Sequence, residues 1–489
     1  MGVRTGAQVL EGLRDGRQLY MDGALVKDVT RDPRLAGGAR TMARLYDMQH
    51  EPARHVEMTY ASPKTGEPVG LSFHHAKTRD DLRLRRKMFT HWHGETLGMF
   101  GRAPDFVNVM LAGFAAAADA FGPHAANVTA YYERAREGDR IATHSLTNPQ
   151  VDRTRDVSAQ ARDLAAKAVG DNDKGVIVRG ARMLATLAAY SDDLLVMPAP
   201  SYPLPDNEDA KPYALGFVIP MATPGVRLIN RPAMVNPGFG SSHDYPLSSR
   251  FDESDCMVVF DNVLAPWENV FIYRDVNIFN NIYRHASLGP AMAHQFSAKD
   301  LCKAEFMLDL AISLAKATKV DEFLHIQGML AELINHVSII RACLESAENN
   351  AALSPRGVMT PHMAPLTAVR YEFPIMFRRA CEIIQIIGAG GLAMVPSFAE
   401  TQGPLAEDVR AYYQAAAADS SIRIRLFRLA HDAAMSTFSG RQQLYERYFA
   451  GDPVRGAAGV YNGLDKEAHL KRISDLLARF EAEGPEKPS

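Results

Sequence analysis

A change of hydrophobic pattern at residues 143–150 constrains the fold of this chain more than any other feature. Apolar residues recur at helical spacing before this stretch, which reads T-H-S-L-T-N-P-Q, and short β-type runs follow it. Pro149 restricts Asn148 to an extended backbone, so we expect a loop or the entry to a strand. Polar side chains thus gather at a seam between two kinds of structure, where ligand clefts often form. An ordinary turn rich in Asn and Pro would explain the same residues.

The segment before the seam, residues 1–143, is predicted to be an N-terminal helical domain. Charged and apolar residues mix at helical spacing in residues 40–45, 82–99 and 127–138, and residues 107–121 are Ala-rich and apolar, as in a buried helix. Asn127 is a candidate N-cap for the last of these helices. Residues 55–71 are expected to form a short hairpin, with its turn at residues 63–66.

The segment after the seam, residues 144–272, is predicted to be a middle β-domain. Its expected strands lie near residues 176–178, 194–197, 213–219, 226–229 and 257–263. Gly, Pro and Asn separate these short strands, and such spacing is typical of a small β-barrel or a sandwich.

The remaining segment, residues 273–489, is predicted to be a four-helix bundle with a tail. Long helices are expected at residues 292–316, 321–349, 371–387 and 406–438. Four small residues, 388–391, are expected to end the third helix, and residues 482–489 are expected to be frayed. The whole is an α+β fold, mostly α. The order of helices, β-domain and bundle is that of the acyl-CoA dehydrogenase fold, an analogy that carries no function by itself.

Charge and cysteine usage exclude several classes of protein. The formal net charge is −3, and Lys and Arg are scattered, so we expect no nucleic-acid partner and no anionic membrane surface. No apolar run reaches the roughly 18 residues of a membrane helix, and we see no signal peptide. The four cysteines are far apart, which argues against a disulfide framework, a metal site or an iron–sulfur cluster and suits a reducing cytoplasm.

A set of short motifs gives the chain a more specific resemblance. They include R-T-G, L-Y-D-M-Q-H, G-R-A-P-D-F, G-A-R-M and G-D-P-V-R, and in chain order they lie at residues 4–6, 45–50, 101–106, 143–150, 180–183, 223–225, 246–250, 260–263, 266–268 and 451–455. Each motif is weak alone. As an ordered set over most of the chain, they resemble the 4-hydroxyphenylacetate 3-hydroxylase family.

The resemblance implies the oxygenase component of a two-component flavin monooxygenase. In such systems an NAD(P)H:flavin reductase supplies reduced FAD (FADH2) by diffusion. The oxygenase reacts it with O2 to a C4a-hydroperoxyflavin and inserts one oxygen atom into a phenolic or other electron-rich aromatic ring. The family has the acyl-CoA dehydrogenase fold, and homotetramers are usual.

Arg102 and His144 are the catalytic candidates that the resemblance implies. A guanidinium can stabilise a phenolate or peroxide anion, and an imidazole can take or share the phenol proton. Helix-end charge for Arg102 and a structural role for His144 are the alternatives. The expected substrate contacts are Arg102, Ala103, Pro104, Asp105, Phe106, His144, Ala199 and Pro200. Asp105 could instead be a helix cap or could orient Arg102.

Flavin contacts are expected from four segments of the chain. By resemblance they are His144, Ser145, Leu146, Thr147, Gln150, Val151, Asp152 and Arg153, then Ala185 and Thr186, then Gly388, Gly390 and Gly391 from a neighbouring subunit, and finally Asp452, Pro453, Val454 and Arg455. Ordinary strand polarity, helix C-capping or a plain turn would explain each segment without a ligand.

Two departures from the family pattern concern the substrate. Phe106 stands where the 4-hydroxyphenylacetate hydroxylases carry a tyrosine, and Ala199-Pro200 replaces a Ser-Thr pair that contacts the substrate carboxylate. The pocket is therefore expected to be more apolar, with a less polar phenol as substrate. The alternatives are a nitrogen heteroaromatic ring, an acyl-CoA dehydratase or dehydrogenase on the same fold, and an inactive flavin-binding protein.

Overall fold

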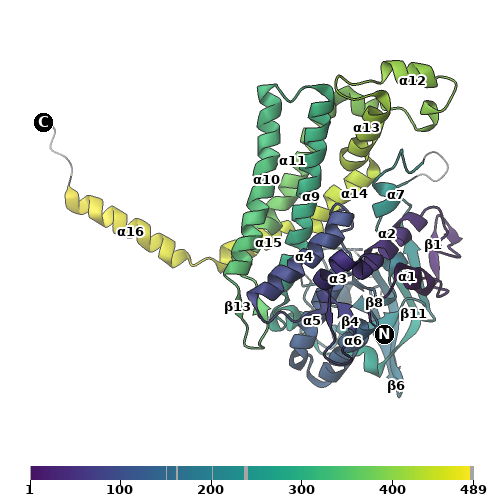
Figure 1. The fold of residues 1–489 in the computed structure, drawn as a ribbon. Helices are drawn as coiled ribbons and strands as arrows, with labels where there is room; N and C mark the ends of the chain where they lie inside the picture. Colours follow the sequence, from purple (N-terminus) through teal and green to yellow (C-terminus); the bar gives the residue numbers. More distant parts are fainter. Residues whose placement is uncertain (1, 150, 161–163, 201, 236–240, 485–489) are drawn as a thin grey trace.

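A computed structural model describes residues 2–149, 151–160, 164–200, 202–235 and 241–484. Figure 1 shows the long C-terminal helices on one side of the molecule, with the sheets and the N-terminal helices on the other. The chain is mostly helical, and its strands form mixed sheets.

Helices dominate the N-terminal part, as the sequence predicts. Its elements are α1 (Gly6–Gly12), β1 (Leu19–Met21), β2 (Ala24–Leu25), α2 (Ala36–Asp47), α3 (Pro52–Met58), β3 (Thr59–Ala61), β4 (Pro68–Gly70), α4 (Arg79–Glu95), α5 (Asp105–Ala116) and α6 (Ala125–Glu137). The predicted hairpin is present as the β3–β4 pair, although His55 belongs to α3. The N-cap prediction for Asn127 is wrong: α6 begins two residues earlier, and the Asn127 amide donates to the carbonyls of Trp267 and Val270 at 2.8 Å.

The middle strands form two sheets. The strands are β5 (Ala142–Ser145), β6 (Lys167–Asn172), β7 (Gly175–Thr186), β8 (Asp193–Val196), β9 (Leu215–Pro220), β10 (Val226–Asn230), β11 (Asp255–Pro266) and β12 (Val270–Tyr273), with helix α7 (Ser248–Phe251) before β11. One sheet has the order β2-β1-β10-β11-β7-β6, and the other has the order β12-β9-β8-β5.

The predicted β-barrel is not confirmed: the strands of the described residues form two sheets, and neither is closed. The alternative of a sandwich describes them better. Phe217 of β9 and Phe260 of β11 lie between the sheets with ring centroids 5.8 Å apart, and such aromatic contacts fill the space between packed sheets. The parallel pairing of β1 with β10 also brings N-terminal residues into the larger sheet.

The C-terminal part contains the longest helices, which run side by side in Figure 1. They are α9 (Leu288–Thr318), α10 (Leu324–Asn349) and α11 (Met363–Ala393), and the other elements are α8 (Val276–His285), β13 (Ala352–Leu353), β14 (Met359–Thr360), α12 (Ala406–Tyr412), α13 (Ser420–Ala434), α14 (Thr437–Tyr448), α15 (Pro453–Gly463) and α16 (Lys466–Glu483). The single helix predicted for residues 406–438 is wrong. Asp419 and Ser436 accept backbone N–H groups as N-caps, and each begins a new helix.

The predicted end of a helix at residues 388–391 is also corrected. α11 is broken at Ala389, which has φ +42° and ψ −140°, but helical structure resumes and reaches Ala393. At the end of the chain, α16 projects from the body of the molecule (Figure 1) and has no buried residue. Residues 482 and 483 belong to this helix, and residues 485–489 of the predicted tail lie outside the described residues.

No single helix in the described ranges is long and apolar enough to cross a membrane. By length and composition, α5 passes that test only together with residues 118–137, which are bent from it by 78°.

Candidate active site

Arg102 lies in the tight turn between α4 and α5. Its guanidinium carbon is 4.1 Å from the centroid of the Phe106 ring, and Nη2 donates to the Phe449 carbonyl at 3.2 Å. Nη1 is buried and has no hydrogen-bond partner among the described residues. No carboxylate in the described chain pairs with this guanidinium. A buried N–H group without an acceptor is costly, so the Arg102 guanidinium is a candidate binding group for an anionic or carbonyl oxygen of a ligand.

His144 lies in β5, opposite Leu195 of β8, and only 7% of it is exposed. Its ring stacks on Phe106, with centroids 5.4 Å apart and an interplanar angle of 22°. Burial, with the charge of Arg102 as a second cause, holds the pKa of His144 well below its usual value of 6.5. The imidazole is therefore neutral near pH 7, and its buried Nδ1 lacks a partner among the described residues.

Asp105 follows the Arg102 turn, and its side chain bonds to helices α4 and α9. Its carboxylate lies 3.0 Å from His93 Nε2 of α4 and accepts a hydrogen bond from Gln295 Nε2 of α9 at 3.0 Å. All three side chains are fully buried. Asp105 thus ties α5 to α4 and α9, and the direct substrate contact expected of it stays a prediction.

The loop predicted to contact flavin begins as an extension of β5 against β7. Ser145 Oγ donates to the Met183 carbonyl at 3.0 Å, and the Thr147 carbonyl accepts from the Met183 N–H at 2.9 Å. The Leu146 carbonyl accepts from Arg182, whose pKa burial lowers to about 10.

The later residues of the predicted flavin loop are less enclosed. Val151 and Arg153 are exposed. Asp152 accepts from the N–H and hydroxyl of Thr154, as in a local turn. Gln150 lies outside the described residues.

Ala185 and Thr186, at the end of β7, lie between two strained positions. Leu184 and Leu187 have φ +62° and +68°, a left-handed conformation that is rare for leucine. Backbone strain of this kind persists where the surroundings enforce it, often at a ligand site. The Thr186 hydroxyl donates to Asp255 at 2.7 Å, and its carbonyl accepts from the Thr143 hydroxyl.

The loop after β8 carries the positions expected to face the substrate tail. The Pro198 carbonyl accepts from the Tyr283 hydroxyl at 3.0 Å. Ala199 is half-buried and Pro200 is exposed, and neither offers a side-chain hydrogen-bonding group. Arg455 lies over the Tyr202 ring at 5.6 Å, which brings the predicted C-terminal flavin segment beside this loop. Asp452 caps α15 through the Arg455 N–H at 2.8 Å, with Pro453 at the first helical position and Val454 exposed.

The glycines of α11 lie in two environments. An added Cβ would meet Leu392 at 2.5 Å from Gly388 and Phe427 at 2.5 Å from Gly391. Nothing lies within 4 Å of a Cβ on Gly390, which is exposed. Close packing inside the chain therefore explains Gly388 and Gly391, whereas Gly390 has no partner in the described chain.

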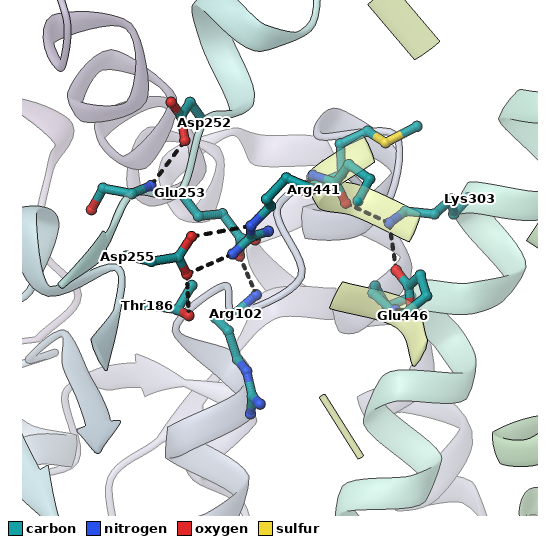
Figure 2. A network of polar contacts seen from close by, with 12 residues as sticks. Arg102, Thr186, Asp252, Glu253, Asp255, Lys303, Arg441 and Glu446 are labelled. Carbon is teal, nitrogen blue, oxygen red and sulfur yellow. Dashed lines mark hydrogen bonds and ion pairs between the residues drawn. The ribbon is translucent and has the colours of Figure 1, made fainter. Parts of the chain in front are cut away.

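Helix α14 supplies site neighbours that the sequence did not suggest. The ring centroids of Tyr445 and of Phe449, the C-cap residue, lie 5.7 and 5.5 Å from the Arg102 guanidinium carbon. Arg441 forms ion pairs with Glu253 and Asp255 (Figure 2). On the next turn, Glu446 pairs with Lys299 and Lys303. Burial raises the pKa of Glu446, but these two cations outweigh it and hold the pKa below its ordinary value. In sequence, α14 is an ordinary helix of mixed charge, so no local signal marked it.

Among the residues that the structure describes, no group of three His, Cys, Asp or Glu side chains could hold a metal ion.

Two models of one protein family match this chain over nearly its whole length. The model described as "4-hydroxyphenylacetate 3-hydroxylase N terminal" matches residues 5–272, and its C-terminal counterpart matches residues 279–478. The chain belongs to the 4-hydroxyphenylacetate 3-hydroxylase family. The resemblance carried by the ordered motifs is thereby confirmed.

Several members of the 4-hydroxyphenylacetate 3-hydroxylase family are similar over nearly their whole length. The 4-hydroxyphenylacetate 3-monooxygenase oxygenase component of Thermus thermophilus is 40% identical, with 97% of each chain covered. The 4-nitrophenol 2-monooxygenase oxygenase component of a Rhodococcus species is 33% identical, covering 99% of this chain and 94% of its own.

Solved structures of the family agree with this fold. A 4-hydroxyphenylacetate 3-monooxygenase oxygenase component complexed with FAD and 4-hydroxyphenylacetate has a TM-score of 0.92 at 40% identity, covering 97% of this chain and 98% of its own. A 4-hydroxybutyryl-CoA dehydratase from N. maritimus has a TM-score of 0.85 at 18% identity, covering 100% and 97%. That likeness shows the fold alone.

Proposed function

We propose that this chain is the oxygenase component of a two-component, FADH2-utilising aromatic monooxygenase. Family membership over almost the whole chain supports the reaction class. The observation that carries the site is the pairing of an unsatisfied Arg102 Nη1 with a stacked, neutral His144 across Phe106. This arrangement fits a planar aromatic ligand with one oxygen that needs hydrogen bonds.

The described residues fit a bound flavin. Unpartnered polar atoms on Arg102 and His144 provide hydrogen-bonding groups that the described chain itself does not use. The left-handed backbone at Leu184 and Leu187 marks the end of β7 as a strained segment beside them, as is common at ligand sites. We assign Ser145, Thr147, Ala185 and Thr186 to holding FAD. When bound, reduced FAD supplies the activated oxygen atom derived from O2, and a separate NAD(P)H:flavin reductase supplies the reduced flavin.

Arg102 and His144 would act together on the phenol. An unperturbed phenol has a pKa near 10 and an imidazole near 6.5, so proton transfer between them costs about 5 kcal/mol before burial increases it. His144 alone is therefore too weak a base. The Arg102 guanidinium stabilises the phenolate oxygen and lowers this cost, while His144 accepts or shares the proton. Electron density then rises at the carbon ortho to the oxygen.

The substrate that we propose is a phenol less polar than 4-hydroxyphenylacetate. Phe106 and the Ala199-Pro200 pair present no side-chain hydroxyl where the resemblance places three. The 4-nitrophenol 2-monooxygenase relative gives a precedent for a phenol without a carboxylate. A nitrogen heteroaromatic ring is the second candidate, because the missing tyrosine hydroxyl is harmless where no phenol is deprotonated.

We further propose a homotetramer in the cytoplasm, with domains at residues 1–143, 144–272 and 273–489. Two observations support association between subunits: Gly390 is exposed without a neighbour, and α16 presents Leu470, Ile473, Leu477 and Phe480 to solvent. Sedimentation analysis with and without FAD would test it, and a monomer that binds FAD with normal affinity would contradict it.

A panel of aromatic compounds tests the proposed reaction. The purified chain would be combined with a general flavin reductase, NADH, FAD and isotopically labelled dioxygen, and products would be examined by mass spectrometry. We expect one labelled oxygen atom in a phenol from the panel. NADH consumption that yields only hydrogen peroxide with every phenol and heteroaromatic compound would contradict a monooxygenase.

A further inference from the structure

The Arg102 turn is fixed by a buried network that the proposed chemistry does not itself use. We propose that Arg441 is a positioning residue: through Glu253 and Asp255 it sets the Arg102 turn against the end of β7. This inference rests on the proposed function, because it concerns the alignment of Arg102 with the assigned flavin strand.

The first connection runs from Arg102 to Arg441. The Arg102 backbone N–H donates to Glu253 Oε1 at 2.5 Å, and Glu253 Oε2 accepts from Arg441 Nη1. The Glu253 side chain is fully buried. In Figure 2 the Arg102 side chain extends away from these carboxylates. The network therefore holds the backbone of Arg102 and leaves its guanidinium charge free for a ligand.

The second connection runs from Arg441 to β7. Arg441 donates from Nη2 to Asp255 Oδ1 at 2.9 Å and from Nε to Oδ2 at 3.2 Å, and the same Oδ1 accepts from the Thr186 hydroxyl at 2.7 Å. Arg441 leads the causes that hold the pKa of Asp255 far below its ordinary value against its burial. The carboxylate thus stays charged and joins the helix to the flavin strand.

Helix α14 also touches the turn directly on either side of this network. Gln442 Nε2 donates to the Met99 carbonyl at 2.8 Å. A Cβ on Gly101 would lie 2.5 Å from the Tyr445 ring, so this close approach requires glycine. Together with the Phe449 carbonyl on Arg102, these contacts make α14 the support on which the Met99–Arg102 turn rests.

An arginine is needed because two carboxylates must be reached at once. A guanidinium presents its donors in a planar fork and can hold Glu253 and Asp255 together, whereas a lysine ammonium is a point charge on a flexible stem. A purely structural ion pair would be served almost equally by either cation. This difference separates a positioning role from a stabilising one.

The test compares Arg441→Gln and Arg441→Lys with a matched control, Arg231→Gln. Arg231 also bonds Asp255, at 2.8 Å, and pairs with Asp252 at 2.6 Å, but no contact joins it to Glu253 in the described chain. Thermal melting measures the stability lost in each full-length variant. Native-state hydrogen exchange of the Arg102 amide measures the turn without reference to activity. Product formed per NADH consumed measures alignment of the site.

We expect the Arg102 amide of Arg441→Gln to exchange about tenfold faster or more, with a change under about threefold in Arg231→Gln. The amount of product formed per NADH consumed should fall about tenfold in Arg441→Gln, and hydrogen peroxide should rise. The KM for the aromatic substrate should change little. Arg441→Lys should recover most of the melting temperature but little of the coupling. If Arg441→Gln does not fold, the isosteric Glu253→Gln variant carries the test, with faster Arg102 exchange and lower coupling expected.

Equal exchange and equal coupling in the Arg441 (or Glu253) variant and the Arg231 control would overturn the proposal. Full recovery of coupling by lysine would overturn it as well. A wild-type protein that oxygenates no compound would instead contradict the proposed function, and the exchange comparison would still decide whether Arg441 positions the turn.

Discussion

Phe106 of α5 stacks on His144 of β5 with 5.4 Å between the ring centroids, and the same phenyl ring lies 4.1 Å from the Arg102 guanidinium carbon. One side chain thus sets the separation of both catalytic candidates. A phenyl ring spaces the two groups without competing for their hydrogen bonds. The identity of residue 106 should therefore control what the substrate oxygen can find around it.

Replacing Phe106 with tyrosine should improve binding of a phenol. The new hydroxyl adds one hydrogen bond, on the order of 1 kcal/mol, so KM for 4-hydroxyphenylacetate should fall about fivefold to tenfold. Steady-state kinetics with a flavin reductase measure this effect. Phe106→Leu is the control, because it keeps an apolar side chain but removes the stack, and it should lower kcat instead. An unchanged KM in Phe106→Tyr would show that residue 106 does not face the substrate oxygen.

Replacing His144 with alanine should leave the fold intact and uncouple the reaction. The loss of a proton acceptor costs roughly 10²-fold in product formation. Hydrogen peroxide should rise correspondingly, because reduced flavin still consumes O2. Product and peroxide assayed in parallel, with circular dichroism for the fold, give the answer. Wild-type coupling in the variant would assign His144 a structural role.

The low pKa of His144 predicts a defined pH dependence of stability. In the folded protein the buried imidazole stays neutral well below pH 6.5, whereas in the unfolded chain it gains a proton near that pH. Its contribution is therefore present above about pH 6.5 and is lost as pH falls toward the folded pKa, by up to about 1.4 kcal/mol per pH unit.

Urea unfolding at pH 7.5 and 5.5 can isolate this contribution. Other buried histidines titrate as well, so wild type is compared with His144→Gln, which has no proton to gain. Between the two pH values wild type should lose about 1 kcal/mol more than the variant. Parallel losses would mean that the folded-state pKa of His144 is not depressed.

Gly390 offers a test of flavin binding across subunits. An added Cβ meets nothing within the described chain, and alanine favours a helix over glycine by about 1 kcal/mol, so Gly390→Ala should fold at least as well as wild type. If a neighbouring subunit's flavin approaches this backbone, affinity for FAD should nevertheless fall. Gly391→Ala should instead be destabilised, because Phe427 occupies the space. Equal FAD affinity in Gly390→Ala and wild type would remove Gly390 from the site.

The protein should bind reduced FAD much more tightly than oxidised FAD, by about tenfold or more. The reason is that the flavin arrives already reduced and that Arg102 offers an unpaired cation to electron-rich ligands. Anaerobic and aerobic titrations give the two affinities. Equal values, or direct reduction of bound FAD by NADH, would contradict the two-component system.

The sequence predicted the long helices well because their apolar periodicity is strong and local. The predicted helices at residues 292–316 and 321–349 correspond to α9 and α10. It failed where one side chain interrupts such a pattern, as Asp419 and Ser436 do between α12 and α14. The division of the strands into two open sheets could not be predicted either, because strand order depends on pairings such as β1 with β10, about 200 residues apart in the chain.

For the site, Arg102 and His144 were identified by resemblance and not by any local pattern. The structure brings both against Phe106, which spacing alone could not predict. The Arg441 network was missed altogether. Its partners Glu253 and Asp255 lie far from Arg441 in the chain. In the sequence of a helix, an arginine that forms buried ion pairs cannot be distinguished from an exposed one.

The two sides of Arg102 are built from separate parts of the chain, and this separation bears on how the enzyme can diverge. Its backbone is held by α14 and by Glu253, which lies just before β11, whereas Ala199 and Pro200 belong to the loop after β8. If the Ala199-Pro200 loop faces the substrate as proposed, mutations in that loop can change which ring is accepted without disturbing the contacts that hold the Arg102 backbone.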